Sequence, residues 1–418
     1  MASKRAWSWK EDYREVVSDA VRRSKEGSVR APLRIRVLTY NILANRLAEE
    51  HYWQLYQGIP KWILDFNYRL RNLCAELELC KPDVVCLQEV EGFEQVSKAL
   101  EELGFVGEFV PRTGLPEGCA TFWRSDAFRA VRTERVEFAD HDLKQNVAIV
   151  HRLRSKEASD DRCLWVANIH VLFNPKRGDI KVAQCRVLLD TCKALMAEHE
   201  GDRDLAVCGD FNSAPNSGVY EFVRTGALDC LRHDRRYLSG QVEGICVGAG
   251  SPRAASARET NCFRLPQSEL AEEEEATTSS RAEEESATGG GGGRTRKKRN
   301  VGNPNKWSAE NLRVATGEPG CGVATHPLDL RSAYVSVTGS EPDYTSAYRR
   351  FLGTVDYIWH TPSLRPLSAL LPVPWEVLSR YYGGGLPNKW WPSDHMSLCC
   401  DFLWTGPEVT KWKNGYYR

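Results

Sequence analysis

The chain has 418 residues, a length that fits either two average domains or one large sandwich. Its 56 lysines and arginines balance 56 aspartates and glutamates, so the overall charge does not indicate polyanion binding, and a nucleic-acid ligand would need a local positive patch. Residues 1–10 are too polar for a signal peptide, and no apolar run approaches the roughly 20 residues of a membrane helix, so we expect a cytoplasmic protein without membrane contact.

Behind a charged lead-in at residues 1–30, apolar periodicity predicts strands that alternate with helices. The predicted strands cover residues 33–41, 82–89, 119–123, 128–138, 147–153, 163–170 and 205–210. The predicted helices cover residues 62–79, 93–103, 179–199 and 217–224. This mixed order indicates an α/β protein whose sheets are buried between helices.

The alternation breaks after about residue 229. Residues 265–305 combine acidic blocks, consecutive glycines and a basic hexapeptide at 294–299, a composition that cannot bury enough apolar surface to fold. We therefore expect a disordered insertion there. The hexapeptide is consistent with a solvated charge run, with a nuclear import signal or with an arm that contacts RNA, so nuclear entry is an alternative to a purely cytoplasmic location.

Beyond the insertion, the core pattern resumes near residue 326 and runs to residue 404. The insertion therefore interrupts one domain and does not separate two. We expect a single catalytic domain at residues 31–405, followed by a tail at residues 406–418.

Polar side chains that bind metals or handle phosphates stand at six places where a strand is expected to stop. They are Asn41, Glu89, His170, Asp210 with Asn212, Asp356, and Asp394 with His395. Side chains at several strand ends along one edge would form one cup, as metal-assisted phosphate-ester hydrolysis requires. The 14 cysteines include no CxxC pair, so their spacing favours reduced core thiols over a zinc site.

The metal would be Mg²⁺, which prefers oxygen ligands and retains several waters. Glu89 ends an apolar strand run and is the expected anchor, although by itself it reads equally as a cap of the following helix. Asn41 by itself reads more often as an Asx-turn residue. Asp394 is a further predicted ligand.

The remaining cup residues suit proton transfer and phosphate contact. Asp210 and Asn212 are two residues apart in extended chain, so both would face one phosphate or one attacking water. His395 titrates near neutral pH, and Asp356 is the expected carboxylate that orients it and favours its protonated form. His170 offers a second imidazole at the end of another strand.

Longer stretches around these residues resemble a known family. They are residues 38–44, 86–90, 117–123, 168–181, 209–213 and 393–395. The chain is similar to the exonuclease–endonuclease–phosphatase superfamily and, within it, to the carbon-catabolite-repressor-type deadenylases, especially Angel proteins and the plant homologues of the yeast deadenylase. The resemblance implies a deoxyribonuclease-like α/β fold, a four-layer sandwich of two mixed β-sheets flanked by helices, with the site at one rim of the sheets.

The same resemblance implies a role for each cup residue. Glu89, with Asn41 beside it, would hold the metal as one of two Mg²⁺ ions, with Mn²⁺ as the alternative. Asp210 and Asn212 would position and activate the attacking water. The two imidazoles would contact the scissile phosphate and stabilise the charge that develops on it, and Asp356 would orient His395.

Loops beside the cup offer contacts for RNA. Arg112, Lys176, Arg177 and Lys181 are expected to neutralise backbone phosphates. Phe173, Trp123 and Tyr344 are expected either to stack on bases or to pack in the core. The full set of predicted substrate contacts is Arg112, Phe173, Asn174, Lys176, Arg177, Lys181, Asn146 and Trp123.

The resemblance implies a Mg²⁺-dependent 3′-exoribonuclease that acts on RNA with a 3′ poly(A) end and releases 5′-AMP. One alternative is a metal-dependent phosphatase of RNA 2′ or 2′,3′-cyclic ends or of a nucleotide cofactor, and another is an inactive RNA-binding scaffold, against which the intact cup argues. The yeast-type enzyme carries leucine-rich repeats ahead of its nuclease domain, whereas only a short charged segment precedes Leu33 here, so we expect no docking to the large deadenylase complex.

Overall fold

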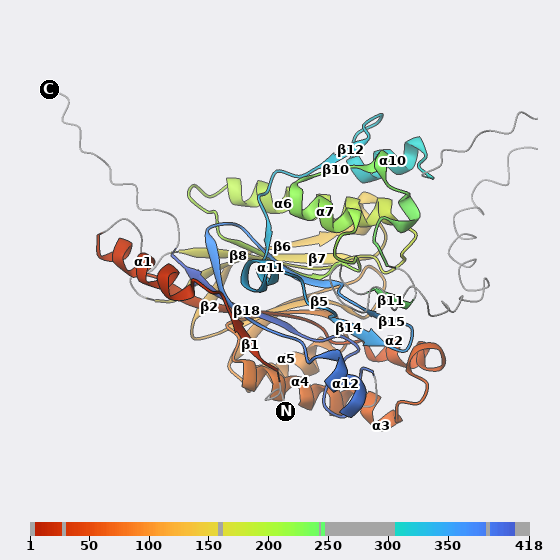
Figure 1. Cartoon of the computed structure of the whole chain (residues 1–418), viewed down its shortest axis with the longest axis horizontal. Helices are drawn as coiled ribbons and strands as arrows, with labels where there is room; N and C mark the ends of the chain where they lie inside the picture. The colour runs from red at the N-terminus through yellow and green to blue at the C-terminus, as the bar shows by residue number, and fades with distance from the viewer. Residues whose placement is uncertain are drawn as a thin grey trace, which may run out of the picture.

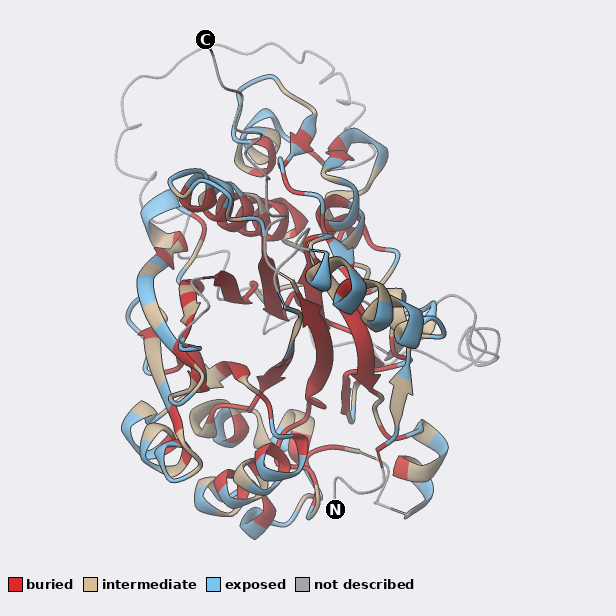
Figure 2. Ribbon diagram, turned by 90° about the vertical axis from the view of Figure 1, so that its left-hand side faces the viewer, coloured by how far each residue is buried: buried red, intermediate tan, exposed pale blue. Residues whose placement is uncertain are grey.

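Two mixed sheets lie face to face, and helices cover the outer side of each (Figure 1). The computed structural model describes residues 5–26, 31–157, 162–241, 244–246 (backbone path only), 306–381 and 385–405. Figure 2 shows the buried strands between helices whose outer faces are exposed. The predicted four-layer α/β sandwich is confirmed.

The first sheet has seven strands, of which only β2 and β3 run parallel to each other. In spatial order they are β1 (Trp7–Trp9), β17 (Leu364–Leu370), β18 (Leu398–Trp404), β2 (Leu33–Asn41), β3 (Val84–Val90), β5 (Gly118–Arg124) and β4 (Phe105–Pro111). Helices α4 (Phe66–Cys80) and α5 (Phe93–Glu101) pack on its outer face through apolar residues such as Leu73 and Val96.

The second sheet has six strands, of which only β8 and β9 run parallel to each other. In spatial order they are β13 (Arg331–Ser332), β16 (Asp356–His360), β9 (Leu205–Asp210), β8 (Cys163–His170), β7 (Val147–Ser155) and β6 (Phe128–Glu137). Helices α6 (Gly178–Ala197), α7 (Gly218–Thr225) and α10 (Ala309–Thr316) cover its outer face (Figure 1).

The space between the sheets is filled by aliphatic, aromatic and small side chains from both. Val37 and Cys86 of the first sheet contact the same cluster as Leu164, Cys208 and Ile358 of the second. Strands β8 and β9 are buried on both faces, which explains why their sequences are nearly continuous apolar runs. Every cysteine whose side chain the structure describes is a free thiol, as their spacing predicted.

Further elements lie outside the two main sheets and their covering helices, or follow them in the chain. The helical ones are α1 (Tyr13–Lys25), α2 (Asn45–Glu50), the π-helix η2 (Tyr52–Tyr56), α3 (Lys61–Leu64), α11 (Ala333–Thr338), α12 (Trp375–Tyr381) and the 3₁₀ turns η3 (Phe138–His141), η4 (Cys230–Arg232) and η5 (Arg235–Tyr237). The extended ones are β10 (Ala227–Asp229) paired with β12 (Val323–Thr325), and a three-stranded sheet of β11 (Gly244–Cys246), β15 (Phe351–Gly353) and β14 (Ser346–Tyr348).

Three expectations about boundaries differ from the structure. The helix predicted at residues 62–79 is two helices, because Asp65 is extended and its side chain accepts a hydrogen bond from the Tyr68 amide to cap α4. Part of the lead-in belongs to the domain, since β1 pairs with β17. The core also resumes earlier than residue 326, because Trp307 and α10 pack against α6.

The insertion at residues 265–305 and the tail at residues 406–418 lie outside the described residues. Among the helices of the described ranges, none is both long enough and apolar enough to cross a membrane.

Candidate active site

The predicted polar residues meet at one rim where the two sheets face each other. Four of them end strands that run toward this rim, which are Asn41 of β2, Glu89 near the end of β3, His170 of β8 and Asp210 of β9. Since β2 and β3 are parallel, and β8 and β9 are parallel, their carboxyl ends share an edge. We call Asn41, Glu89, His170, Asp210, Asp356 and His395 the cup.

The expectation that every cup residue follows a strand is wrong for two of them. Asp356 is the first residue of β16, and His395 precedes β18. Both strands are antiparallel to a neighbour that ends at the rim: Asp356 lies opposite Asp210 in the β16–β9 register, and β18 pairs with β2. In an antiparallel pair, the start of one strand meets the end of the other, so these residues reach the same rim.

Asn41 joins the two sheets across the cup. Its Nδ2 donates to Glu89 Oε1 at 2.9 Å and to Asp210 Oδ2 at 3.1 Å, while its Oδ1 accepts from the Leu43 amide. The sequence allowed Asn41 to be either an Asx-turn residue or a cup residue, and in the structure it is both. The second oxygen of Glu89 accepts from the Ala44 amide at 3.0 Å, and helix α5 begins only after Gly92, so Glu89 does not cap that helix.

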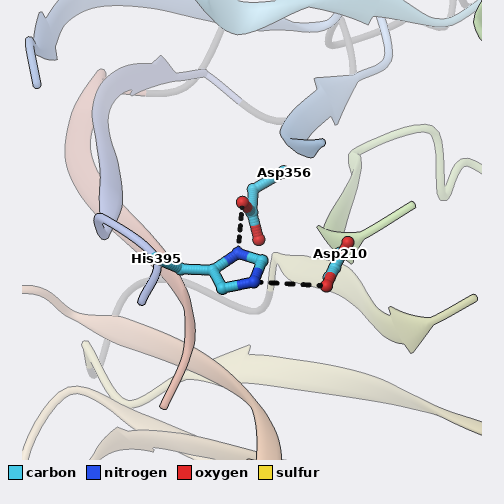
Figure 3. A group of neighbouring side chains, drawn as sticks. All are labelled: Asp210, Asp356 and His395. Atoms are coloured by element: carbon cyan, nitrogen blue, oxygen red, sulfur yellow. Dashed lines mark hydrogen bonds and ion pairs between the residues drawn. The ribbon is translucent and has the colours of Figure 1, made fainter. Parts of the chain in front are cut away.

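His395 has the carboxylate partner that the sequence predicted. Its Nδ1 lies 2.8 Å from Asp356 Oδ2, and its Nε2 lies 3.9 Å from Asp210 Oδ2 (Figure 3). Burial lowers the pKa of His395, but the charge of Asp356 outweighs it and raises that pKa well above the usual value. His395 is therefore protonated at neutral pH.

His170, unlike His395, has no carboxylate within hydrogen-bond distance. Its Nε2 lies 3.6 Å from Asp210 Oδ2 and 3.9 Å from Glu89 Oε1, beyond hydrogen-bond distance. Burial, followed by the positive charges of Arg112 and His395, lowers the pKa of His170 to about 3. The cup thus holds one neutral and one charged imidazole, because only one of them has a carboxylate in direct contact.

The predicted geometry of Asn212 is wrong. We expected Asp210 and Asn212 to point the same way in extended chain, but β9 ends at Asp210 and Asn212 has a left-handed backbone with φ of 46°. The chain turns because Asp210 Oδ1 accepts from the Asn212 amide at 2.8 Å. The Asn212 side chain donates to Val171 O and accepts from Gln241, so it lies beside the cup.

Asp394 is buried, but its hydrogen bonds do not link it to the cup. Its Oδ2 accepts from the Tyr56 hydroxyl at 2.9 Å, and its Oδ1 lies 3.4 Å from Ser393 Oγ. The Ser393 hydroxyl also donates to Asn41 O at 2.6 Å, which connects the His395 loop to the end of β2. A role for Asp394 as a metal ligand stays a prediction.

Two of the predicted substrate contacts, Trp123 and Lys181, are buried, and Tyr344 packs in the core, which is one of the two roles that the sequence allowed it. Trp123 is only 5 % exposed and packs between the sheets beside His151, and Tyr344 is buried with its hydroxyl donating to Val373 O. Lys181 lies on the inner face of α6, where its ammonium donates to Asn212 O and to Gln241 Oε1. These positions suit packing and support of the site better than direct contact with RNA.

The other predicted contacts lie nearer the surface or support the cup. Phe173 is 59 % exposed and Lys176 is exposed, whereas Arg177 is half-buried and paired with Asp179. Arg112 Nη1 lies 3.1 Å from Glu117 Oε1, and the Asn174 side chain accepts from the Lys176 amide. The remaining one, Asn146, is buried and donates to His170 O at 3.1 Å.

Two supporting residues were not predicted. The Thr345 hydroxyl donates to Asp356 Oδ2 at 2.6 Å. Arg69 is fully buried and donates to Ile42 O, Leu43 O and Leu64 O, so it holds the chain that follows Asn41. A signal for Arg69 existed, because it lies four residues before Leu73 on the mainly apolar stripe of α4.

Asp210, Asp356 and His395 offer donor atoms within 4.8 Å of one another and could hold a metal ion. A protonated His395 does not ligate a cation, so the side of the cup with Glu89 and Asp210 fits one better. Burial, and then the charge of Asp356, raises the pKa of Asp210 to about 7. A cation bound nearby would stabilise the ionised carboxylate and lower this pKa again. Crowded buried carboxylates of this kind fit a hard divalent cation.

The comparisons with known proteins agree with this geometry. Residues 38–395 match the Endonuclease/Exonuclease/phosphatase family. The chain belongs to this family. It is 35 % identical over 385 residues to Carbon catabolite repressor protein 4 homolog 5 of Arabidopsis thaliana, which covers 87 % of this chain and 76 % of the relative. It is also 28 % identical to Protein angel homolog 2 of Bos taurus, over 88 % of this chain and 68 % of that protein.

Solved structures show the same relationship. The fold superposes with a TM-score of 0.67 on ANGEL2, described as a 2′,3′-cyclic phosphatase in complex with adenosine-2′,3′-vanadate, at 25 % identity over 96 % of this chain and 99 % of that one. The human nocturnin catalytic domain shares the fold, with a TM-score of 0.51 and 19 % identity over 96 % of this chain and 98 % of that one. The resemblance to this family that the motifs indicated is thus confirmed.

Proposed function

We propose that this family member is a metal-dependent hydrolase of phosphodiester bonds at the 3′ ends of RNA, and that it removes terminal adenylates as 5′-AMP. The observation that carries the proposal is the cup itself. Carboxylates, one charged imidazole and one neutral imidazole converge at a single rim, as the hydrolysis of a phosphate ester requires.

Glu89 would hold the metal, with Asn41 beside it to orient the Glu89 carboxylate, and we expect the metal to be Mg²⁺, in two copies, with Mn²⁺ as the alternative. When bound, such an ion polarises the phosphate and lowers the pKa of water. Donor chemistry supports this assignment, since Mg²⁺ prefers carboxylate and carbonyl oxygens.

The chain's own residues would handle protons and charge. Asp210, at the centre of the cup, would accept the proton of the attacking water, and Asn212 would steer the loop beside it. His395, kept protonated by Asp356, would stabilise the negative charge that grows on the phosphate oxygens. His170, which is neutral, would donate a hydrogen bond to the same phosphate.

A second function on the same cup is the hydrolysis of a 2′,3′-cyclic phosphate at an RNA end. Two observations support it. The superposed ANGEL2 structure is described as a 2′,3′-cyclic phosphatase. The burial of Trp123 and Lys181 also removes two side chains that we expected to contact a longer RNA chain.

One experiment separates these functions. Purified protein is incubated with Mg²⁺ and 5′-labelled RNA that ends either in adenylates or in a 2′,3′-cyclic phosphate, with the Glu89→Ala variant as the control. A ladder of shortened products that the variant does not make supports the exonuclease. Loss of the cyclic phosphate without shortening supports the phosphatase, and a wild-type protein inert on both RNAs and on a phosphorylated nucleotide cofactor contradicts the proposal.

A further inference from the structure

An exposed tryptophan stands beside the cup. Trp53 is 73 % exposed, more than any other large apolar side chain in the described part of the chain. It lies in η2, a π-helix, a rare conformation that often marks a functional segment. The Tyr52 ring contacts it edge-on at a centroid distance of 5.2 Å. A single exposed apolar residue is ordinary, so its surroundings decide what it does.

Helix η2 is attached to the loop that carries His395 of the cup. Three residues after Trp53, the Tyr56 hydroxyl donates to Asp394 Oδ2 at 2.9 Å, and Asp394 is the neighbour of His395 in the chain. The β14–β15 hairpin reaches the same place, since Ser346 forms an isolated bridge with His395. Tyr348 of this hairpin packs against an apolar cluster that includes residues of η2. Helix and hairpin therefore flank one loop of the cup.

The tip of this hairpin carries two adjacent arginines. Arg349 and Arg350 form the turn between β14 and β15, and Arg349 is exposed. Arg349 Nη1 donates to Gln57 Oε1 at 2.9 Å, which ties the turn to the end of η2 while its charge remains available. Lys61 adds a third positive charge, with its ammonium 6.0 Å from the centre of the Tyr52 ring.

The carboxylates next to η2 already have partners: Asp394 accepts from Tyr56, and two glutamates of α2, just before η2, are also engaged. Glu50 already pairs with Arg46 at 2.6 Å, and Glu49 accepts from the Asn45 side chain at 2.8 Å. The surface that contains Trp53, Arg349 and Arg350 therefore combines one aromatic face with unshared positive charge. Single-stranded nucleic acid is recognised by this combination, because bases stack on aromatic rings while basic groups contact the backbone.

We infer that Trp53, Arg349 and Arg350 bind the RNA chain upstream of the 3′ end that enters the cup. This inference rests on the proposed function, and it supplies the interactions that buried Trp123 and Lys181 cannot make. Trp53 would stack on one base, and the two arginines would contact phosphates. The groups act on binding and remain outside the chemistry, so their effect grows with RNA length.

The test measures binding with no turnover. Fluorescence anisotropy in EDTA compares a 12-nucleotide oligoadenylate with a dinucleotide, using wild type, Trp53→Ala and the double variant Arg349→Ala/Arg350→Ala. We expect Trp53→Ala to weaken binding of the longer RNA about tenfold and leave the dinucleotide unchanged. For the double variant, the slope of log affinity against log salt should fall by about 0.7 for each phosphate that the arginines no longer neutralise.

Matched controls are Trp9→Ala, which removes another exposed tryptophan on the edge strand β1, and Arg331→Ala on the edge strand β13. Neither should change binding of either RNA. Equal affinity of wild type and Trp53→Ala for the 12-mer, or equal losses on both lengths, would overturn the inference. Failure of the proposed function is seen separately, as wild type that binds RNA but hydrolyses no 3′ end with Mg²⁺ present.

Discussion

The cup and the surface around it are built in opposite ways. In the cup, nearly all of the functional groups are buried and most are hydrogen-bonded to a neighbour in it, as the bonds from Asn41 to Glu89 and Asp210 and from His395 to Asp356 show. Around it, Phe173 and Trp53 are exposed and contribute few polar interactions. The difference indicates that the chemistry is fixed by preorganised groups, whereas the choice of substrate depends on exposed ones. Substitutions in the cup should therefore lower kcat, and substitutions around it should raise KM.

The largest effect is expected at the centre of the cup. Asp210→Asn keeps the shape of the side chain and its capping of the Asn212 amide, but removes the base that accepts the proton of water. We expect kcat to fall by about 10³-fold, the middle of the range for loss of general-base catalysis, with little change in KM. Single-turnover kinetics on a labelled 3′ end measure this. A variant within about tenfold of wild type would remove Asp210 from the chemistry.

The next effect concerns the charge on His395. Asp356→Asn removes the carboxylate that keeps His395 protonated, so the pKa of His395 should drop and the protonated form should disappear as the pH rises. We expect kcat to fall by about 10²-fold at pH 8 and by clearly less at pH 5.5, where the imidazole regains its proton. A pH–rate profile of wild type and variant gives the comparison, and exposed Asp329→Asn is the control. An equal loss at both pH values would contradict the assignment.

A smaller effect is expected outside the cup. Phe173→Ala removes an exposed ring beside the predicted substrate loop, so KM for an adenylate-ended RNA should rise about fivefold to tenfold while kcat stays the same. Leu231→Ala, another exposed apolar residue, should leave both constants unchanged. Steady-state kinetics of wild type and both variants give the kcat and KM values to compare. A fall in kcat without a change in KM would place Phe173 with the buried groups.

The smallest expected effect is on the free energy of unfolding and its dependence on pH. Burial lowers the pKa of His151 from 6.5 to about 3, so the unfolded chain binds more protons at this site below pH 6.5 and stability is lost as the pH falls. His151 alone should lower the free energy of unfolding by about 2 kcal/mol between pH 7 and pH 5. Urea unfolding of His151→Gln and wild type at both values tests this. Identical pH dependence in the two proteins would contradict it.

The sequence predicted the central strands well and the peripheral ones poorly. Strands β8 and β9 match the prediction to the residue, because they are buried on both faces and end abruptly at His170 and Asp210. Strand β4, which contains Gly107, was not predicted. The structure explains this glycine, because a Cβ there would lie 2.3 Å from the Phe122 ring of the neighbouring strand.

At the site, too, some residues could be predicted from the sequence and others could not. Cup residues were recognisable because polar groups at the ends of apolar runs are unusual. Trp123 and Lys181 were misassigned because residue type does not reveal whether a side chain is buried. Thr345 acts on Asp356 only through a hydrogen bond made in the folded chain. The roles of catalytic and ligand residues remain predictions until the variants above are measured.

The hydrogen bond from Ser393 to Asn41 spans 352 residues and has a consequence for the timing of synthesis. A growing chain carries Asn41, Glu89 and Asp210 long before His395 exists. Strand β2 also lacks its neighbour β18 until the last described strand has been made. Interactions between residues this distant form late, so the nascent protein should be unable to attack RNA, including the message being translated, until β18 has been synthesised and has paired with β2.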